Sequence, residues 1–254
     1  MEVESYDHGV PSWVDLGTPE PKKAARFYSS LFGWDVQEGP PESGGYAIAH
    51  LRGKAVAGLG TQQNPGPPEW MTYVNVDSAD DTVAKVKANG GVVFMEPFDV
   101  MHVGRMAVVA DPAGAVLGLW EPKAHKGAGI VNEPGTFSWA ELLTTDTDAA
   151  KTFYAAVFGW GEETHAGAGP GGAYTEWKLG GRSISGMMVK PAEMPAEVPP
   201  HWNVYFAVED TDKAVEQIKT LGGGLVMGPM DIEPGRFAVV GDDQDAHFNI
   251  ITLR

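Results

Sequence analysis

Residues 13–34 read WVDLGTPEPKKAARFYSSLFGW, and residues 139–160 read WAELLTTDTDAAKTFYAAVFGW. Both stretches contain a Trp, an acid two positions later, a Phe-Tyr pair and a closing Phe-Gly-Trp, at a constant separation of 126 residues. Three later landmarks recur at separations of 131 to 132 residues: Asp99 with Asp231, Gly104-Arg105 with Gly235-Arg236, and Asp111 with Asp242. Solenoid repeats are about 20–50 residues long, so this much longer repeat indicates a duplicated domain.

Each half divides into two units with the same predicted order of strand, helix and three strands. Helical spacing of apolar residues predicts helices that begin after residue 18 (with Thr18 as N-cap) and at 78–89, 147–158 and 211–221. We therefore expect a first domain at 1–122, a Gly- and Ala-rich linker at 123–135 and a second domain at 136–254. The Pro-rich stretches 64–68 and 190–200 are predicted loops, and Gly167–Gly172 and Gly222–Gly224 are predicted turns.

Composition limits the partners and the compartment. A net charge of −16 repels phosphate backbones, so we expect no nucleic-acid partner. No apolar run reaches the roughly 18 residues of a membrane span, and the acidic N-terminus lacks the order of a secretory signal. The absence of cysteine excludes disulfides and thiolate chemistry, and it is typical of a cytoplasmic protein.

Four βαβββ units in two pairs, with the Phe-Tyr-x-x-x-Phe-Gly-Trp motif closing the first helix of each pair, resemble the vicinal oxygen chelate superfamily of glyoxalases, bleomycin-resistance proteins and extradiol dioxygenases. The resemblance covers nearly the whole chain. It implies an α+β fold in which two tandem glyoxalase-like domains each form an eight-stranded half-open cup, with helices outside and a small-molecule ligand inside. Smaller relatives pair two modules by dimerising. The duplication supplies that pairing in one chain, which is compatible with a monomer and does not exclude a homodimer.

Many members of that family hold a divalent metal in the cup. The family's ligand positions correspond here to Trp13, Met71 and Gly118 in the first half and to Trp139, Asn203 and Asn249 in the second. Divalent ions prefer imidazole, carboxylate or carbonyl donors. This set is therefore unsuited to a metal, and we predict no metal and no other cofactor.

Alternation along strands places aromatic and acidic side chains together inside the predicted cups. If Trp13 faces inward, so does Asp15, and the same parity turns Trp139 and Glu141 into the second cup. The remaining inward positions that we predict to contact the substrate are Tyr73, Asn75, Trp120, Asn203, Tyr205 and Asn249. Indole and phenol rings with a few polar groups suit a flat, aromatic or oxygenated small molecule.

Asp15 and Glu141 are the predicted catalytic acids, because a carboxyl group in an apolar cup holds its proton more tightly and can act as general acid or base near neutral pH. The competing interpretation is that these acids bind Arg105 and Arg236 or cap a turn. Both arginines are also candidates to anchor an anionic ligand. His247 replaces Val116 of the first half, and it is either a third catalytic group paired with Glu141 or an exposed residue beside an acidic turn.

Three functions remain open from the sequence, and we favour the first. It is a metal-independent enzyme, a lyase, isomerase or cyclase, that uses Asp15 or Glu141, with or without His247, on a small carbonyl or polyketide-like substrate. The second is a protein that sequesters a drug or natural product by stacking, as bleomycin-resistance proteins do. The third is a glyoxalase or dioxygenase with a displaced metal site, such as Glu141, His247 and Asn203.

Overall fold

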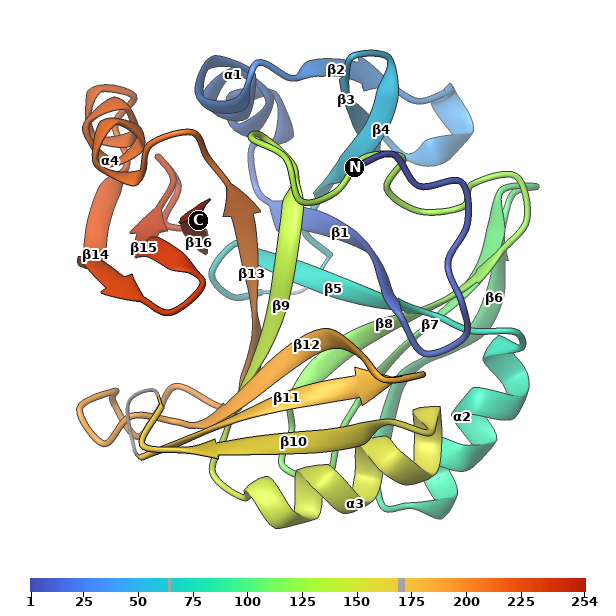
Figure 1. Ribbon diagram of the computed structural model, residues 1–254. Helices are drawn as coiled ribbons and strands as arrows, with labels where there is room; N and C mark the ends of the chain where they lie inside the picture. Colours follow the sequence, from blue (N-terminus) through green and yellow to red (C-terminus); the bar gives the residue numbers. More distant parts are fainter. Residues whose placement is uncertain (64, 169–171) are drawn as a thin grey trace.

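The computed structural model describes residues 1–63, 65–168 and 172–254, and within them the strand–helix–strand–strand–strand unit occurs four times (Figure 1). The first half comprises β1 (Pro11–Thr18), α1 (Pro21–Phe32), β2 (Asp35–Glu38), a short 3₁₀ helix (Pro41–Ser43), β3 (Ala47–Leu51), β4 (Lys54–Thr61), β5 (Glu69–Asn75), α2 (Ala79–Ala88), β6 (Val92–Val100), β7 (Gly104–Ala110) and β8 (Val116–Pro122). The second half comprises β9 (Phe137–Thr144), α3 (Thr147–Phe158), β10 (Gly161–Ala166), β11 (Ala173–Leu179), β12 (Arg182–Val189), β13 (His201–Ala207), α4 (Thr211–Thr220), β14 (Gly224–Ile232), β15 (Gly235–Gly241) and β16 (His247–Leu253).

The predicted helices lie where the spacing placed them, and one predicted cap is wrong. α3 has the predicted bounds, and α2 begins after Ser78, whose hydroxyl accepts a hydrogen bond from the backbone N–H of Asp81. α1 instead begins after Glu20, which makes no side-chain cap. Thr18 is the last residue of β1, two positions before the N-cap, and its hydroxyl donates to the side-chain oxygen of Gln244 at 2.9 Å. Parts of the loop and turn predicted at 64–68 and 167–172 lie outside the described residues.

The strands form one continuous 16-stranded sheet with two eight-stranded parts, which we call the first and the second sheet, and this confirms the predicted pairing of units. The first runs β2-β3-β4-β1-β5-β8-β7-β6, and the second runs β10-β11-β12-β9-β13-β16-β15-β14. They meet where β16 lies beside β5 through a parallel pair between His247 and Glu69. In each sheet the strands that open the two units are antiparallel neighbours, so Trp13 lies opposite Tyr73 and Trp139 opposite Tyr205.

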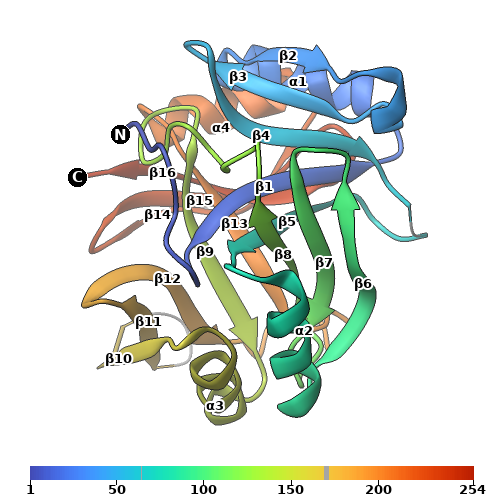
Figure 2. The same cartoon turned by 90° about the vertical axis from the view of Figure 1, so that its right-hand side faces the viewer.

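The helices lie on the outside of the sheets, and they pack in pairs that cross the halves. α1 lies beside α4, and α2 lies beside α3 (Figures 1 and 2). Phe32 of α1 packs on Phe206 and Phe248 of the second half, with ring centroids 5.1 and 6.3 Å away. The two halves therefore share a continuous hydrophobic core.

Two equivalent hydrogen-bonded relays join the halves inside this core. Tyr28 of α1 donates to Asp242 in the turn before β16, and Trp70 donates to the Tyr28 hydroxyl. Their counterparts in the other pair of units are Tyr154, Asp111 and Trp202, at 3.1 and 3.0 Å. Each first helix is thus fixed to a turn of the opposite half.

The segment predicted as the interdomain linker, residues 123–135, is packed against the first sheet. Ala128, Ile130 and Val131 are buried, and Ile130 forms a bridge with Glu2 near the N-terminus. Backbone hydrogen bonds fix this Gly- and Ala-rich stretch along its length. Among the helices of the described residues, none is long and apolar enough for a membrane crossing.

Candidate functional site

Each sheet has one face covered by helices and a second face that we call the helix-free face. On β1, Val14 and Leu16 are fully buried in the core under the helices, so Trp13 and Asp15 point to the opposite side. On β9, Ala140 and Leu142 are buried in the same way, and Trp139 and Glu141 alternate with them. The parity predicted from the sequence therefore places each acid beside its Trp on a helix-free face.

The first site is a set of four hydrogen-bonded side chains, which we call the first tetrad: Trp13, Asp15, Tyr46 and Tyr73. Tyr46 and Tyr73 both donate their hydroxyls to Oδ2 of Asp15, each at 3.0 Å. The Trp13 indole donates to the Tyr46 hydroxyl at 3.1 Å. These contacts bring β1, β5 and the residue preceding β3 together around one carboxyl group.

The second tetrad repeats this arrangement with Trp139, Glu141, Tyr174 and Tyr205. Tyr205 donates to Oε1 of Glu141 at 2.9 Å, and Tyr174 also hydrogen-bonds to that carboxyl group. Trp139 donates to the Tyr174 hydroxyl at 2.9 Å. The same four roles thus recur in both halves, with a longer acid in the second.

Burial sets the electrostatics of both acids. It raises the pKa of Asp15 to about 6, and the hydrogen bonds from Tyr46 and Tyr73 offset part of the rise. Burial likewise raises the pKa of Glu141, which is only 5% exposed, to about 7. Both carboxyl groups can therefore gain and lose a proton near neutral pH, as a general acid or base must.

The phenols respond to the same surroundings. Burial, and next the charge of Asp15, raises the pKa of Tyr73 well above its usual value. Tyr205 is affected in the same way by burial and by Glu141. These phenols therefore stay protonated at neutral pH and act as hydrogen-bond donors to the acids.

Four other predicted substrate-binding residues lie on the helix-free faces with different surroundings. Asn75 is buried and donates to the backbone oxygens of Tyr6 and Asp7, and the Trp120 indole donates to the backbone oxygen of His125 at 2.9 Å. Asn203 is half-buried and lies opposite Glu141 in the sheet. Asn249 is 1% exposed, and its side-chain oxygen has no hydrogen-bond partner among the described residues.

Arg105 and Arg236 are not brought to the tetrads. Arg105 pairs with Asp80 of α2 at 2.7 Å and with Asp99, on the helix-covered side of its sheet. Arg236 makes the equivalent ion pairs with Asp212 of α4 and Asp231. The interpretation that these arginines bind Asp15 and Glu141 is wrong, because acids of the helices and edge strands hold both guanidinium groups. This placement also gives no support to a role in substrate binding.

His247 is exposed at the start of β16, beside Glu69 of β5. Among the described residues it makes no hydrogen bond or ion pair with Glu141, whose partners are the two phenols. His247 therefore lies at the solvent-exposed end of a strand, which agrees with the second interpretation, an exposed residue beside an acidic turn. A catalytic role for it stays a prediction.

Sequence reasoning missed Tyr46, Tyr174 and His125. The two tyrosines do carry a signal, because they are equivalent in the repeat and each faces a glycine, Gly58 or Gly186, in the neighbouring strand. A Cβ at either glycine would overlap the tyrosine hydroxyl, so the glycines make room for the phenols. His125 has no equivalent in the repeat and could not be found by comparing the halves.

The family's metal-ligand positions do not fit a metal here. Trp13 and Trp139 direct their indole N–H groups to phenols. A side chain at Gly118 would overlap the Tyr73 ring, so that position has no room for a ligand. Asn203 and Asn249 offer only neutral amides, which leaves no carboxylate or imidazole donor in either set.

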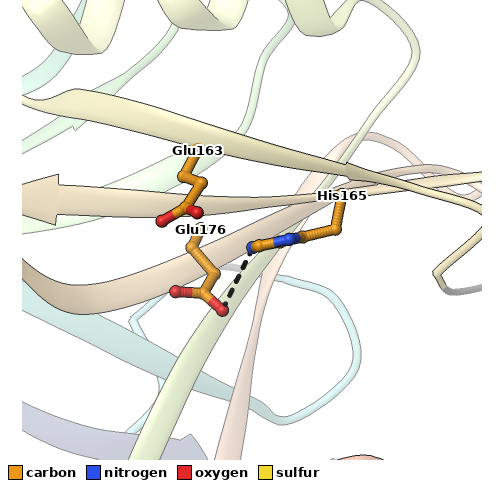
Figure 3. A group of neighbouring side chains, drawn as sticks. All are labelled: Glu163, His165 and Glu176. Atoms are coloured by element: carbon orange, nitrogen blue, oxygen red, sulfur yellow. Dashed lines mark ion pairs between the residues drawn. The ribbon is translucent and has the colours of Figure 1, made fainter.

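One group of the described residues could in principle share an ion: Glu163, His165 and Glu176 on β10 and β11, with ligand atoms within 4.8 Å of one another (Figure 3). His165 lies 3.5 Å from Glu176. The Lys178 ammonium already pairs with Glu176 at 2.7 Å and with Glu163 at 2.9 Å. Both carboxylates are thus already paired with a cation from the chain itself.

Comparison with known proteins places these features in a family. The sequence model of the Glyoxalase/Bleomycin resistance protein/Dioxygenase superfamily matches residues 11–119 and 136–249. "Putative glyoxylase CFP32" of Mycobacterium tuberculosis is 43% identical over 256 residues, which covers 97% of this chain and 95% of that protein. "Anthracycline biosynthesis protein DnrV" of Streptomyces peucetius is 36% identical over 263 residues, which covers 97% of this chain and 94% of that protein.

Solved structures show the same fold at low sequence identity. The Mn(II)-bound glyoxalase from Novosphingobium aromaticivorans superposes with a TM-score of 0.68 at 18% identity, covering 97% of this chain and 83% of that one. The 2,3-dioxygenase LapB from Pseudomonas sp. KL28 superposes with a TM-score of 0.67 at 12% identity, covering 96% and 93%. The overall architecture is thus that of the glyoxalases and extradiol dioxygenases.

Proposed function

Since the chain belongs to the Glyoxalase/Bleomycin resistance protein/Dioxygenase superfamily, we propose that it is a glyoxalase-like enzyme that acts on a small molecule without a metal. It binds a flat, oxygenated aromatic metabolite against the Trp and Tyr rings of a tetrad. The tetrad carboxyl group, Asp15 or Glu141, then acts as general acid and base in a lyase, isomerase or cyclase reaction.

One observation carries this proposal: in both halves a buried carboxyl group has its pKa raised to about 6 or about 7 while phenol hydroxyls hold it in place. Such a group removes a proton from a carbon next to a carbonyl and returns it to another atom of the same molecule. This proton transfer consumes no other reagent. General acid–base catalysis of this kind contributes about 10²–10⁴-fold to a rate.

The names of the relatives support the substrate class. DnrV is named for anthracycline biosynthesis, and anthracyclines are flat, oxygenated polycyclic compounds. Rings of that kind stack on indole and phenol surfaces, while a few polar groups fix their orientation. A tetrad offers both kinds of contact.

A second candidate function is sequestration of such a compound without chemistry. The observation in its favour is a separate apolar cluster on the second helix-free face, formed by Tyr205, Phe237 and Ile251 with Trp139 and Met230 packed against it. A stacking surface of this kind is sufficient for binding. The two functions differ in whether the acids are needed after the ligand has bound.

Proton exchange on a probe ketone separates the two functions. 2-Acetyl-1-naphthol is flat and hydroxylated, and its acetyl protons exchange with D₂O when a base removes them, which NMR records. We expect the wild-type protein to accelerate this exchange. The double variant Asp15→Asn/Glu141→Gln should reduce the acceleration at least 100-fold, while its Kd for the ketone changes only several-fold.

Asp212→Asn is the matched control, because it makes the same acid-to-amide change at an exposed residue on the helix-covered side. This variant should exchange protons at the wild-type rate. Full activity in the variant that lacks both tetrad acids would show that neither group is the base. Tight binding of the ketone with no exchange by the wild type would favour sequestration.

A further inference from the structure

An aromatic ring of the chain itself occupies the first site. The imidazole of His125 packs edge-on against Trp13 with ring centroids 4.3 Å apart and planes at 82°, and it lies 5.5 Å from Trp120. Trp13 is consequently only 4% exposed. A flat ligand that stacked on Trp13 would compete with this imidazole.

The segment that carries His125 is held in place at both ends. At the N-terminal end of the segment, the backbone N–H of His125 donates to the carbonyl oxygen of Val103 at 2.9 Å. Beyond it, the N–H of Ala128 donates to Ser12 at 2.8 Å. Gly127 passes so close to β1 that a Cβ would lie 2.6 Å from the Ser12 carbonyl oxygen, and its φ of +107° also requires glycine. This covering of the first site is therefore part of the folded chain.

The second site has the same tetrad and lacks the covering ring. Trp139 is half-buried and packs at the border of the cluster of Tyr205, Phe237 and Ile251. Among the described residues it forms no stacked or edge-on ring pair like that of Trp13 with His125. Ile251 is the counterpart of Trp120 in the repeat. Ile251 lies opposite Ala207 of β13, and Trp120 lies opposite Asn75, the equivalent position of β5. The smaller side chain leaves the surface beside Trp139 less crowded than the surface beside Trp13.

The second site also has polar groups without counterparts in the first. Asn249, with its unpartnered side-chain oxygen, stands where the first half has Gly118. Glu176 lies two residues beyond Tyr174 on the same face of β11, next to Glu163 and His165 of the neighbouring strand (Figure 3). The equivalent position in β3 is Ile48. The first site has unpartnered buried atoms of its own, Asn75 Oδ1 and His125 Nε2, so the two sites differ most in the ring that covers Trp13 and not in their number of polar groups.

We infer that the second site alone binds the ligand. An aromatic ring of the ligand packs against Trp139 there, in the same way as the His125 imidazole packs against Trp13 in the first site. This inference rests on the proposed function and specifies its site. The ligand class is a flat aromatic compound that is uncharged in the ring and carries hydroxyl or carbonyl groups. The chemistry of the internal ring agrees with this class, because burial lowers the pKa of His125 to about 4 and keeps the imidazole neutral.

Binding stoichiometry tests the inference with 1,4-dihydroxyanthraquinone as the probe. Titration followed by tryptophan fluorescence and calorimetry should give one probe per chain. Trp139→Ala should weaken binding at least tenfold, and the same substitution at Trp13 should weaken it less than threefold. His125→Ala should raise the stoichiometry to two, because it uncovers the first tetrad.

Hydrogen exchange of the unmodified chain gives a second measurement that depends on no variant. The probe should increase protection in peptides from β9 and β13, and leave peptides from β1 and β5 unchanged. The inference would be overturned by a stoichiometry of two probes per wild-type chain, or of one in His125→Ala. Protection confined to β1 and β5, or no binding up to the solubility of the probe, would also overturn it. Binding at the second site without proton exchange on the naphthol ketone would instead contradict the proposed catalysis and leave this inference standing.

Discussion

Glu141 binds a proton more tightly in the folded chain than in the unfolded one, because burial raises its pKa from 4.5 to about 7. The folded state therefore holds more protons than the unfolded state between these values, and stability falls as the pH rises through this range. A shift of this size corresponds to about 3 kcal/mol of unfolding free energy. We expect urea denaturation of the wild type to show this fall between pH 5 and pH 8, and Glu141→Gln to show a smaller one.

Asp212→Asn controls for the change of an acid to an amide. Its partner Arg236 lowers the pKa of Asp212, so this group stays ionised throughout the same pH range and the substitution should leave the slope unaltered. In Glu141→Gln two groups of opposite sign act on the remaining slope: Asp15, whose pKa is raised to about 6, makes stability fall as the pH rises, and His125, whose pKa is lowered to about 4, makes it rise. Equal slopes for Glu141→Gln and the wild type would mean that Glu141 is not protonated near neutral pH.

Tyr205 stabilises the charged form of Glu141 by donating its hydroxyl at 2.9 Å. Tyr205→Phe removes that donor and should raise the pKa of Glu141 further. Infrared spectroscopy of the carboxylic-acid C=O stretch during a pH titration measures this shift directly, with the Glu141→Gln spectrum subtracted. A pKa that falls or stays constant in Tyr205→Phe would show that the phenol does not stabilise the carboxylate.

At the scale of the elements, strand alternation was sufficient to predict which face each acid takes. Val14 and Leu16 are apolar and pack under a helix, so Asp15 between them must point to the other side. The same periodicity, applied to helices, predicted the bounds of α3. These features follow from patterns of neighbouring residues, which a single sequence displays.

The contacts between distant elements could not be predicted in this way. Tyr46 reaches Asp15 only because β3 and β4 bring it over Gly58, and local periodicity does not specify that approach. Arg105 is bound by Asp80 of a helix, whereas the sequence offered Asp15 as an equally suitable partner. His125 enters the first site because backbone hydrogen bonds hold a segment whose composition is typical of a flexible linker.

The two relays that tie a first helix to a turn of the opposite half give a prediction at this scale. Tyr154→Phe leaves the buried Trp202 indole N–H and one oxygen of Asp111 without the hydroxyl that now joins them. Unpaired buried groups cost about 1–3 kcal/mol, and we expect a loss of that size in urea denaturation. Tyr28→Phe makes the same change in the other relay and should cost a similar amount. Unchanged stability in both variants would show that the relays do not hold the halves together.

At the scale of the whole molecule, the duplication has not produced two independent bodies. The helices pack across the halves, α1 with α4 and α2 with α3, so the core under each helix pair contains side chains from both copies (Figure 1). A half removed from the other would expose the apolar face of its first helix to water. The shared core also fixes the two tetrads relative to each other, although only the second has an uncovered indole.

Phe32→Ala tests whether the halves unfold together. Phe32 belongs to the first half and packs on Phe206 and Phe248 of the second, so its loss should cost about 3–5 kcal/mol. Because the core is shared, we expect calorimetry to record a single transition at a lower temperature, and hydrogen exchange to show less protection in β13 and α4 as well as in α1. Lys22→Ala, which removes an exposed side chain from the same helix, is the control and should change neither measurement. Two separated transitions, or a loss of protection confined to the first half, would mean that each half is stable on its own.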